Sequence, residues 1–249
     1  MSQREAQATG THSRENRSLL AGPEKRVLIW LAGRLPLAIN SDHLSAIGLA
    51  AMFAAGVSFA AFRLTPWAAA GVVISLAINW FGDSLDGTVA RVRNQQRPRY
   101  GYYVDHVIDL AGTTFLVAGL AASGLMSPLL AAALLAAYLL VSAETYLATH
   151  ARGVFRMSFL GLGPTELRIL VAAGALKAAY DPVVFIGSMG PLALFDIGGA
   201  IASAGLALVF VTSAVRNTRA LYAAERLPGT AGAVARRLKP ALCTHNHDS

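Results

Sequence analysis

The sequence predicts an all-α integral membrane protein with six transmembrane helices, an interfacial amphipathic helix before them, and both termini in the cytoplasm. The 249 residues are 55% hydrophobic and only 14% charged, with a mean hydropathy of +0.50. Soluble domains usually carry about 25% charged residues, so a soluble enzyme and a disordered protein are both excluded. The apolar residues also gather in runs of the length that crosses a bilayer, about 20 residues each.

The first 35 residues precede these runs. Residues 1–22 are polar and lack the apolar segment of a signal peptide, so we expect a disordered tail. In residues 23–35 (PEKRVLIWLAGRL) the large apolar side chains share one helical face, and Lys25 and Arg26 lie opposite. That pattern is typical of a helix in the membrane interface.

Six apolar runs then predict the transmembrane helices. They cover residues 43–64, 66–85, 102–125, 128–148, 165–180 and 192–215, of which the fifth is the shortest. Pro66, Pro128 and Pro191 each open a run, and the start of a helix tolerates proline best. We expect one membrane domain over 23–227 and a cytoplasmic tail over 228–249. The tail sequence Cys243-Thr-His245-Asn-His247 matches no zinc-site spacing.

The basic residues predict the orientation. With six spans, all but two of the 21 lysines and arginines fall on the side of both termini, the exceptions being Arg63 and Lys177. The positive-inside rule then places both termini in the cytoplasm and the protein in the cell membrane. The net charge of +7 is explained by cytoplasmic loops beside anionic lipids, so no nucleic-acid partner is expected.

Four aspartates lie close together where the second predicted span meets the third. They are Asp83, Asp86, Asp105 and Asp109. On a helix, the first two share an arc of about 140° with three other residues, namely Gly87, Ala90 and Arg91. On the next helix an arc of about 80° holds Gly101, Asp105 and Asp109. Two facing helices would therefore direct four carboxylates into one cleft at the cytoplasmic surface.

Carboxylates at membrane depth are costly unless cations neutralise them. Oxygen ligands in this number suit two Mg²⁺ or Mn²⁺ ions, which could in turn hold a diphosphate. Gly87 and Ala90 leave room for a nucleotide, and Arg91 lies within reach of a phosphate. The alternative is that arginines pair with the aspartates, which would explain one aspartate better than four. The arginines concerned are Arg91, Arg93, Arg97 and Arg99.

Two nearby segments read Asp83-Ser-Leu-Asp86-Gly87-Thr-Val-Ala90-Arg91 and Gly101-Tyr-Tyr-Val-Asp105-His-Val-Ile-Asp109. Together they resemble the signature of the CDP-alcohol phosphatidyltransferase family. The linker between them is one residue longer than the commonest form. The resemblance implies an enzyme of phospholipid biosynthesis that transfers a substituted phosphate from a CDP-alcohol to an acceptor hydroxyl and releases CMP.

The resemblance also implies residue roles. Asp83, Asp86 and Asp105 resemble the metal ligands, and Asp109 resembles the residue that both binds a metal and acts as general base. The residues that resemble the nucleotide and diphosphate contacts are Asp83, Gly87, Ala90, Arg91 and Gly101. The expected partners are a CDP-alcohol and an acceptor alcohol, one of them a lipid, together with the bilayer and a second copy of the chain.

Three further charged residues, Glu144, Glu166 and Arg168, are candidates for the acceptor site because they face the same side as the aspartates. A structural role, such as pairing or helix capping, explains them equally well. The pairs Asp105-His106 and Thr165-Glu166 also resemble the choline and ethanolamine phosphotransferases of the family. Whether the donor or the acceptor carries the lipid stays open: the donor could be CDP-diacylglycerol or a CDP-amino alcohol.

Two other functions fit an aspartate cluster in a membrane. An intramembrane prenyltransferase also binds a diphosphate through Mg²⁺, but it usually has more spans and two separate aspartate motifs. A cation transporter would place acidic residues at mid-membrane, between broken helices. The small residues Gly87 and Ala90 beside Arg91 favour the nucleotide hypothesis.

Overall fold

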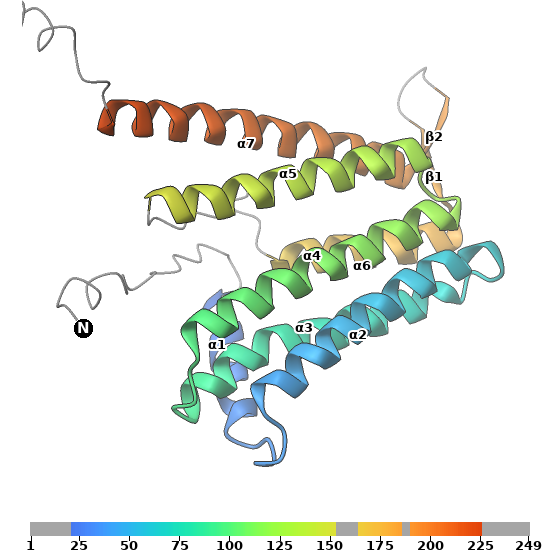
Figure 1. Cartoon of the computed structure of the whole chain (residues 1–249). Coiled ribbons are helices and arrows are strands. Elements are labelled where there is room, and N and C mark those ends of the chain that lie inside the picture. Colours follow the sequence, from blue (N-terminus) through green and yellow to red (C-terminus); the bar gives the residue numbers. More distant parts are fainter. Residues whose placement is uncertain (1–20, 153–163, 186–189, 226–249) are drawn as a thin grey trace, which may run out of the picture. The chain divides into compact units, whose positions relative to one another are not determined.

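The computed structural model describes residues 21–152, 164–185 and 190–225, and these are mainly helical (Figure 1). In chain order the elements are α1 (Ala21–Ala32), α2 (Ser41–Ala60), the 3₁₀ turn η2 (Ala61–Arg63), α3 (Ala68–Val92), α4 (Pro98–Ser123), α5 (Pro128–Arg152), α6 (Pro164–Tyr180), β1 (Val183–Phe185), β2 (Pro191–Ala193) and α7 (Leu194–Ala224). The chain divides into one unit through Phe210 and a second from Val211. In the second unit, residues 211–224 continue α7.

Five of the described helices are long and apolar enough to cross a membrane: α2 with η2, α3, α4, α5 and α7. The fifth predicted span, residues 165–180, corresponds to α6, which has 17 residues. At 1.5 Å per residue α6 is about 26 Å long, slightly shorter than the hydrocarbon core of a bilayer. The helical class is confirmed, whereas the count of six spans and the side of the termini stay predictions.

Several helices extend beyond the apolar runs that predicted them. α3 continues to Val92 instead of ending at Leu85, α5 continues to Arg152, and α7 continues to Ala224 instead of Val215. An apolar run marks only the part of a helix that meets lipid, whereas polar residues carry the helix on into water. The extension of α3 is functionally important because it places residues 86–91 of the signature on a helix.

The predicted boundaries were wrong at the start of the last span and at the end of the N-terminal tail. Leu192 was predicted to be helical but lies in β2, which pairs antiparallel with β1 so that Phe185 is opposite Pro191 and Val183 is opposite Ala193. Pro191 therefore begins a strand, another position that does not need its missing N–H. Ala21 and Gly22, predicted in the tail, begin α1, which ends at Ala32. The rest of both tails, with the Cys243–His247 motif, lies outside the described residues.

Small residues bring α2, α3 and α4 close together in the first unit. A Cβ on Gly82 of α3 would lie 2.6 Å from the carbonyl oxygen of Leu44 and 2.9 Å from the amide of Gly48, both on α2. About two turns farther along α2, Gly56 meets Gly119 of α4 in the same way. Such contacts between small residues are typical of transmembrane helices, which gain mainly from close packing. They fix which faces of these helices meet.

The helix α1 packs against the end of α3 through a separate apolar cluster. This cluster consists of Leu28, Ala32, Leu44, Leu85 and Val89, all buried. The guanidinium of Arg93 reinforces it by donating to three backbone carbonyls of the segment between α1 and α2. The accepting oxygens belong to Leu35 (2.9 Å), Pro36 (3.2 Å) and Ile39 (2.6 Å). The segment then enters α2 at Asn40, whose side chain caps the helix by accepting from the His43 amide at 2.9 Å.

The contact at Gly82 predicts a stability effect. Gly82→Ala would place a methyl group against the backbone of α2, which cannot rotate away, so we expect a loss of about 1–3 kcal/mol in stability. Thermal unfolding in detergent would show a lower Tm. The matched control is Gly198→Ala in α7, where a Cβ meets nothing within 4 Å. Equal Tm values for the two variants would contradict the proposed backbone contact.

Candidate active site

Three of the four signature aspartates, one on α3 and two on α4, come close together in the structure. Carboxylate oxygens of Asp83, Asp105 and Asp109 all lie within 4.8 Å of one another. Asp105 and Asp109 come from one face of α4 because they are four residues apart, and Asp83 comes from α3. Asp83 and Asp105 are half-buried, whereas Asp109 is exposed. An all-oxygen donor set with this spacing fits a hard divalent cation such as Mg²⁺ or Mn²⁺.

Asp86 lies outside this group of three and is held by its own contacts. The hydroxyl of Ser45 on α2 donates to its Oδ2 at 2.6 Å, and the amide of Gly87 donates to its Oδ1. One carboxylate therefore accepts from two donors on different parts of the chain. The role of Asp86 as a fourth metal ligand stays a prediction.

Arg168 of α6 reaches the aspartate group from another helix. Its Nη2 lies 2.5 Å from Oδ2 of Asp83, and its Nε donates to Oδ1 of Asn79 at 2.8 Å. The side chains of Arg168 and Asp83 are only 16% and 28% exposed, so water and salt screen this ion pair less than one on the surface. Asn79 is buried and also donates to the carbonyl of Gly48 on α2 at 3.0 Å. One polar network thus joins α2, α3 and α6.

The arginine-pairing alternative is only partly consistent with these contacts. Arg93 binds backbone carbonyls, as described above, and Arg97 pairs with Asp42 of α2 instead of a signature aspartate. Arg91 donates to the hydroxyl of Thr88 at 3.1 Å. Within the described part of the chain, Arg168 forms an ion pair with the signature residue Asp83, and the sequence pattern had grouped Arg168 with the acceptor site.

The other two acceptor-site candidates lie on the helices next to this network. Glu144 on α5 and Glu166 at the start of α6 are both half-buried. Among the described residues, neither belongs to the group of three carboxylates within 4.8 Å. Arg168 is the candidate that the structure brings to the aspartates, and an acceptor role for all three stays a prediction.

An aromatic cluster lies behind Asp105. His106 is buried, its Nδ1 lies 2.7 Å from the carbonyl oxygen of Tyr102, and its ring is 4.1 Å from the Tyr102 ring, centroid to centroid. Tyr146 of α5 packs edge-on against the same imidazole at 5.0 Å. These contacts hold the first turns of α4 against α5 and so fix the backbone that carries Asp105.

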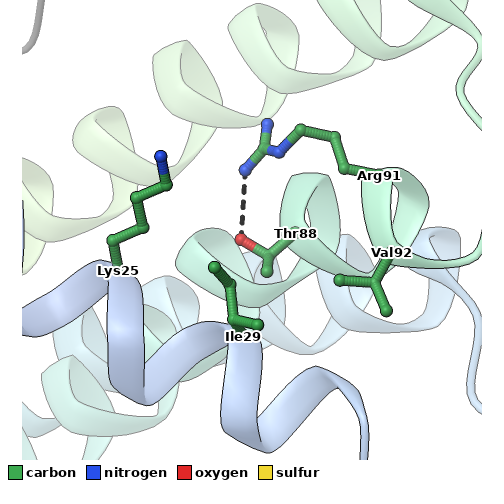
Figure 2. Close-up of a pocket in the computed structure, with 5 residues that line it drawn as sticks. All are labelled: Lys25, Ile29, Thr88, Arg91 and Val92. Carbon is green, nitrogen blue, oxygen red and sulfur yellow. Dashed lines mark hydrogen bonds between the residues drawn. The ribbon is translucent and has the colours of Figure 1, made fainter.

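The predicted nucleotide strip lies along α3 beyond Asp86. A Cβ on Gly87 would meet Nη1 of Arg91 at 3.4 Å, so the guanidinium lies over the glycine. A Cβ on Gly101 of α4 would meet nothing within 4 Å, which leaves that position open to a ligand. The guanidinium of Arg91 also lines a cavity shared with α1 (Figure 2).

Sequence reasoning missed Ser45, Asn79 and the aromatic cluster. Asn79 could have been found, because it is a polar residue inside an apolar run, four residues before Asp83 and on the same helical face. Ser45 and Tyr146 carry no comparable signal. Serine and tyrosine are common in membrane helices, and the contacts of these two depend on which helices pack together.

Comparisons with known proteins agree with the signature. The family model described as CDP-alcohol phosphatidyltransferase matches residues 43–215, more than half of the chain. No curated protein sequence matches. Among solved structures, the chain is similar to phosphatidylinositol phosphate synthase of Mycobacterium tuberculosis with CDP-DAG bound. The TM-score is 0.51 and the identity 20%, and the similarity covers 82% of this chain and 96% of that one. At this identity the likeness shows a shared fold.

Proposed function

Because the chain belongs to the CDP-alcohol phosphatidyltransferase family, we propose that it transfers a substituted phosphate from a CDP-alcohol to an acceptor hydroxyl. The new bond joins the acceptor oxygen to phosphorus, the bond from that phosphorus to the CMP oxygen breaks, and the hydroxyl proton passes to a base. The observation that carries this proposal is the carboxylate group of Asp83, Asp105 and Asp109 within the family signature. A prenyltransferase and a cation transporter would require neither Gly87 nor Arg91.

In this proposal the chain's own residues divide the work. Asp83, Asp105 and Asp109, with Asp86 beside them, would hold two divalent cations such as Mg²⁺, which would offset the negative charge on the departing CMP. Asp109 takes the proton of the acceptor hydroxyl, and its exposure leaves it accessible to that substrate. Arg168 holds Asp83 in position, and Asn79 in turn holds the guanidinium of Arg168.

We also propose that α6 crosses the bilayer in spite of its length. With five spans the two termini would lie on opposite sides and the basic residues would be split between them. With six, the protein is a multi-pass protein of the cell membrane whose aspartates face the cytoplasm. A short span is tolerated by local thinning of the bilayer at modest cost.

An assay with three candidate donors identifies the CDP-alcohol that the protein uses. Purified protein with Mg²⁺ is given CDP-diacylglycerol, CDP-choline or CDP-ethanolamine in turn, each with matching acceptors. We expect one donor to release CMP and to give a phospholipid product of the corresponding mass. Failure of all three donors to release CMP, in protein that remains folded, would contradict the proposed reaction.

The nucleotide strip gives a separate prediction. CMP should raise the Tm of the protein in the presence of Mg²⁺, whereas neither a prenyltransferase nor a transporter should respond to it. Ala90→Leu should weaken CMP binding at least about tenfold, because a side chain on this face takes the space of the nucleotide. A folded variant that binds CMP normally would show that the nucleotide lies elsewhere. Ala143→Leu, at an exposed position of α5, is the matched control.

A further inference from the structure

A cavity of about 300 Å³ lies between α1 and the end of α3, a volume at the lower end of the range for small-molecule sites. Figure 2 shows the five residues that line it: Lys25, Ile29, Thr88, Arg91 and Val92. Two of these side chains are cationic, one carries a hydroxyl, two are aliphatic and none is acidic. The cavity therefore suits a ligand with a negative group and an organic part.

Arg91 connects this cavity to the signature residues. It donates one hydrogen bond to Thr88, which leaves other donors of its guanidinium for a ligand. Helical side chains lean toward the N-terminus, and Arg91 accordingly lies over Gly87, whose amide donates to Asp86. The same guanidinium thus borders both the cavity and the strip that the proposed function gives to the nucleotide.

We propose that Lys25 is a further donor-binding residue, whose ammonium group binds a phosphate of the CDP-alcohol together with Arg91. This inference rests on the proposed function. Arg91 can bind a phosphate through two parallel hydrogen bonds, whereas Lys25 acts as a point charge from the opposite wall. Ile29 and Val92 supply apolar surface for the organic part of the donor. α1, which lies outside the signature, would therefore take part in substrate binding.

Calorimetric titration of the detergent-solubilised full chain with CDP and with CMP, in Mg²⁺, tests this role. CDP is the probe because it carries the diphosphate that all candidate donors share. Lys25→Gln should weaken CDP binding about threefold to tenfold, as expected for one contact between an exposed cation and a phosphate. Lys25→Arg should restore most of the affinity, because it retains the charge. Arg26→Gln removes the same charge from the same helix outside the cavity lining and should bind CDP normally.

The outcomes separate this inference from the proposed function. If wild-type protein binds CDP and Lys25→Gln binds it equally well, the inference fails and the proposed function stands. If wild-type protein binds neither CDP nor CMP, both fail. A third arm measures binding to phosphatidylglycerol vesicles. If Lys25→Gln weakens only that binding, the lysine serves the bilayer surface and the inference is overturned.

Discussion

Asp109→Asn should still bind a CDP-alcohol with metal, yet turn over at least about a hundredfold more slowly than wild-type protein. Asparagine keeps the shape of the side chain and one oxygen for a cation, but it cannot accept the proton of the acceptor hydroxyl. Asp109 is the exposed member of the carboxylate group, one helical turn beyond Asp105. Loss of a general base typically lowers rates by about 10²–10⁴.

The experiment combines donor binding by calorimetry with initial rates at saturating acceptor. Asp86→Asn is the comparison, because that residue is predicted to bind metal and has no proposed role in proton transfer. If Asp109→Asn loses as much donor affinity as Asp86→Asn, Asp109 is only another ligand. Rates close to wild type would remove Asp109 from the mechanism.

Metal removal should abolish turnover, and addition of Mg²⁺ or Mn²⁺ to the stripped protein should restore it. The three carboxylates cannot hold a diphosphate without cations. Their oxygens lie within 4.8 Å of one another, and their combined negative charge would repel the negatively charged diphosphate. Three variants should each lose turnover as well, and added Mg²⁺ or Mn²⁺ should not restore it: Asp83→Asn, Asp86→Asn and Asp105→Asn. Turnover and the Tm are measured in parallel, so that inactive but folded protein is recognised.

The matched control for these variants is Asp181→Asn. Asp181 is an exposed carboxylate after α6, and its hydrogen bond with Lys177 (2.8 Å) lowers its pKa below the ordinary value, so Asp181 is charged at neutral pH. We expect this variant to retain full activity. Full activity of EDTA-treated enzyme would be incompatible with the predicted metal centre.

The part of the predicted site that the structure brings together depends on spacing within one helix. Asp105 and Asp109 share a face because they are four residues apart, and the group that contains them also contains Asp83. Asp86 shows the limit of this reasoning. Helical periodicity predicts the direction of the Asp86 side chain to within a broad arc. It does not predict the contact with Ser45, whose hydroxyl donates a hydrogen bond to one carboxylate oxygen of Asp86.

Contacts between helices far apart in sequence could not be predicted, because close packing decides them. Arg168 meets Asp83 only because α6 packs against α3, and Ser45 meets Asp86 only because Gly82 allows α2 to approach. The hairpin was missed for a local reason. Leu192 and Ala193 are as apolar as the helix that follows, so composition alone extended the helix through them.

The three carbonyl contacts of Arg93 bear on where the domain begins. The family match starts at residue 43, inside α2. Yet the carbonyls that Arg93 binds lie at Leu35, Pro36 and Ile39, and α1 covers Leu85 and Val89. A chain cut at the edge of the sequence match would leave a guanidinium without its acceptors and two aliphatic side chains uncovered. The packed unit is therefore larger than the sequence match and includes α1 from Leu28 onward.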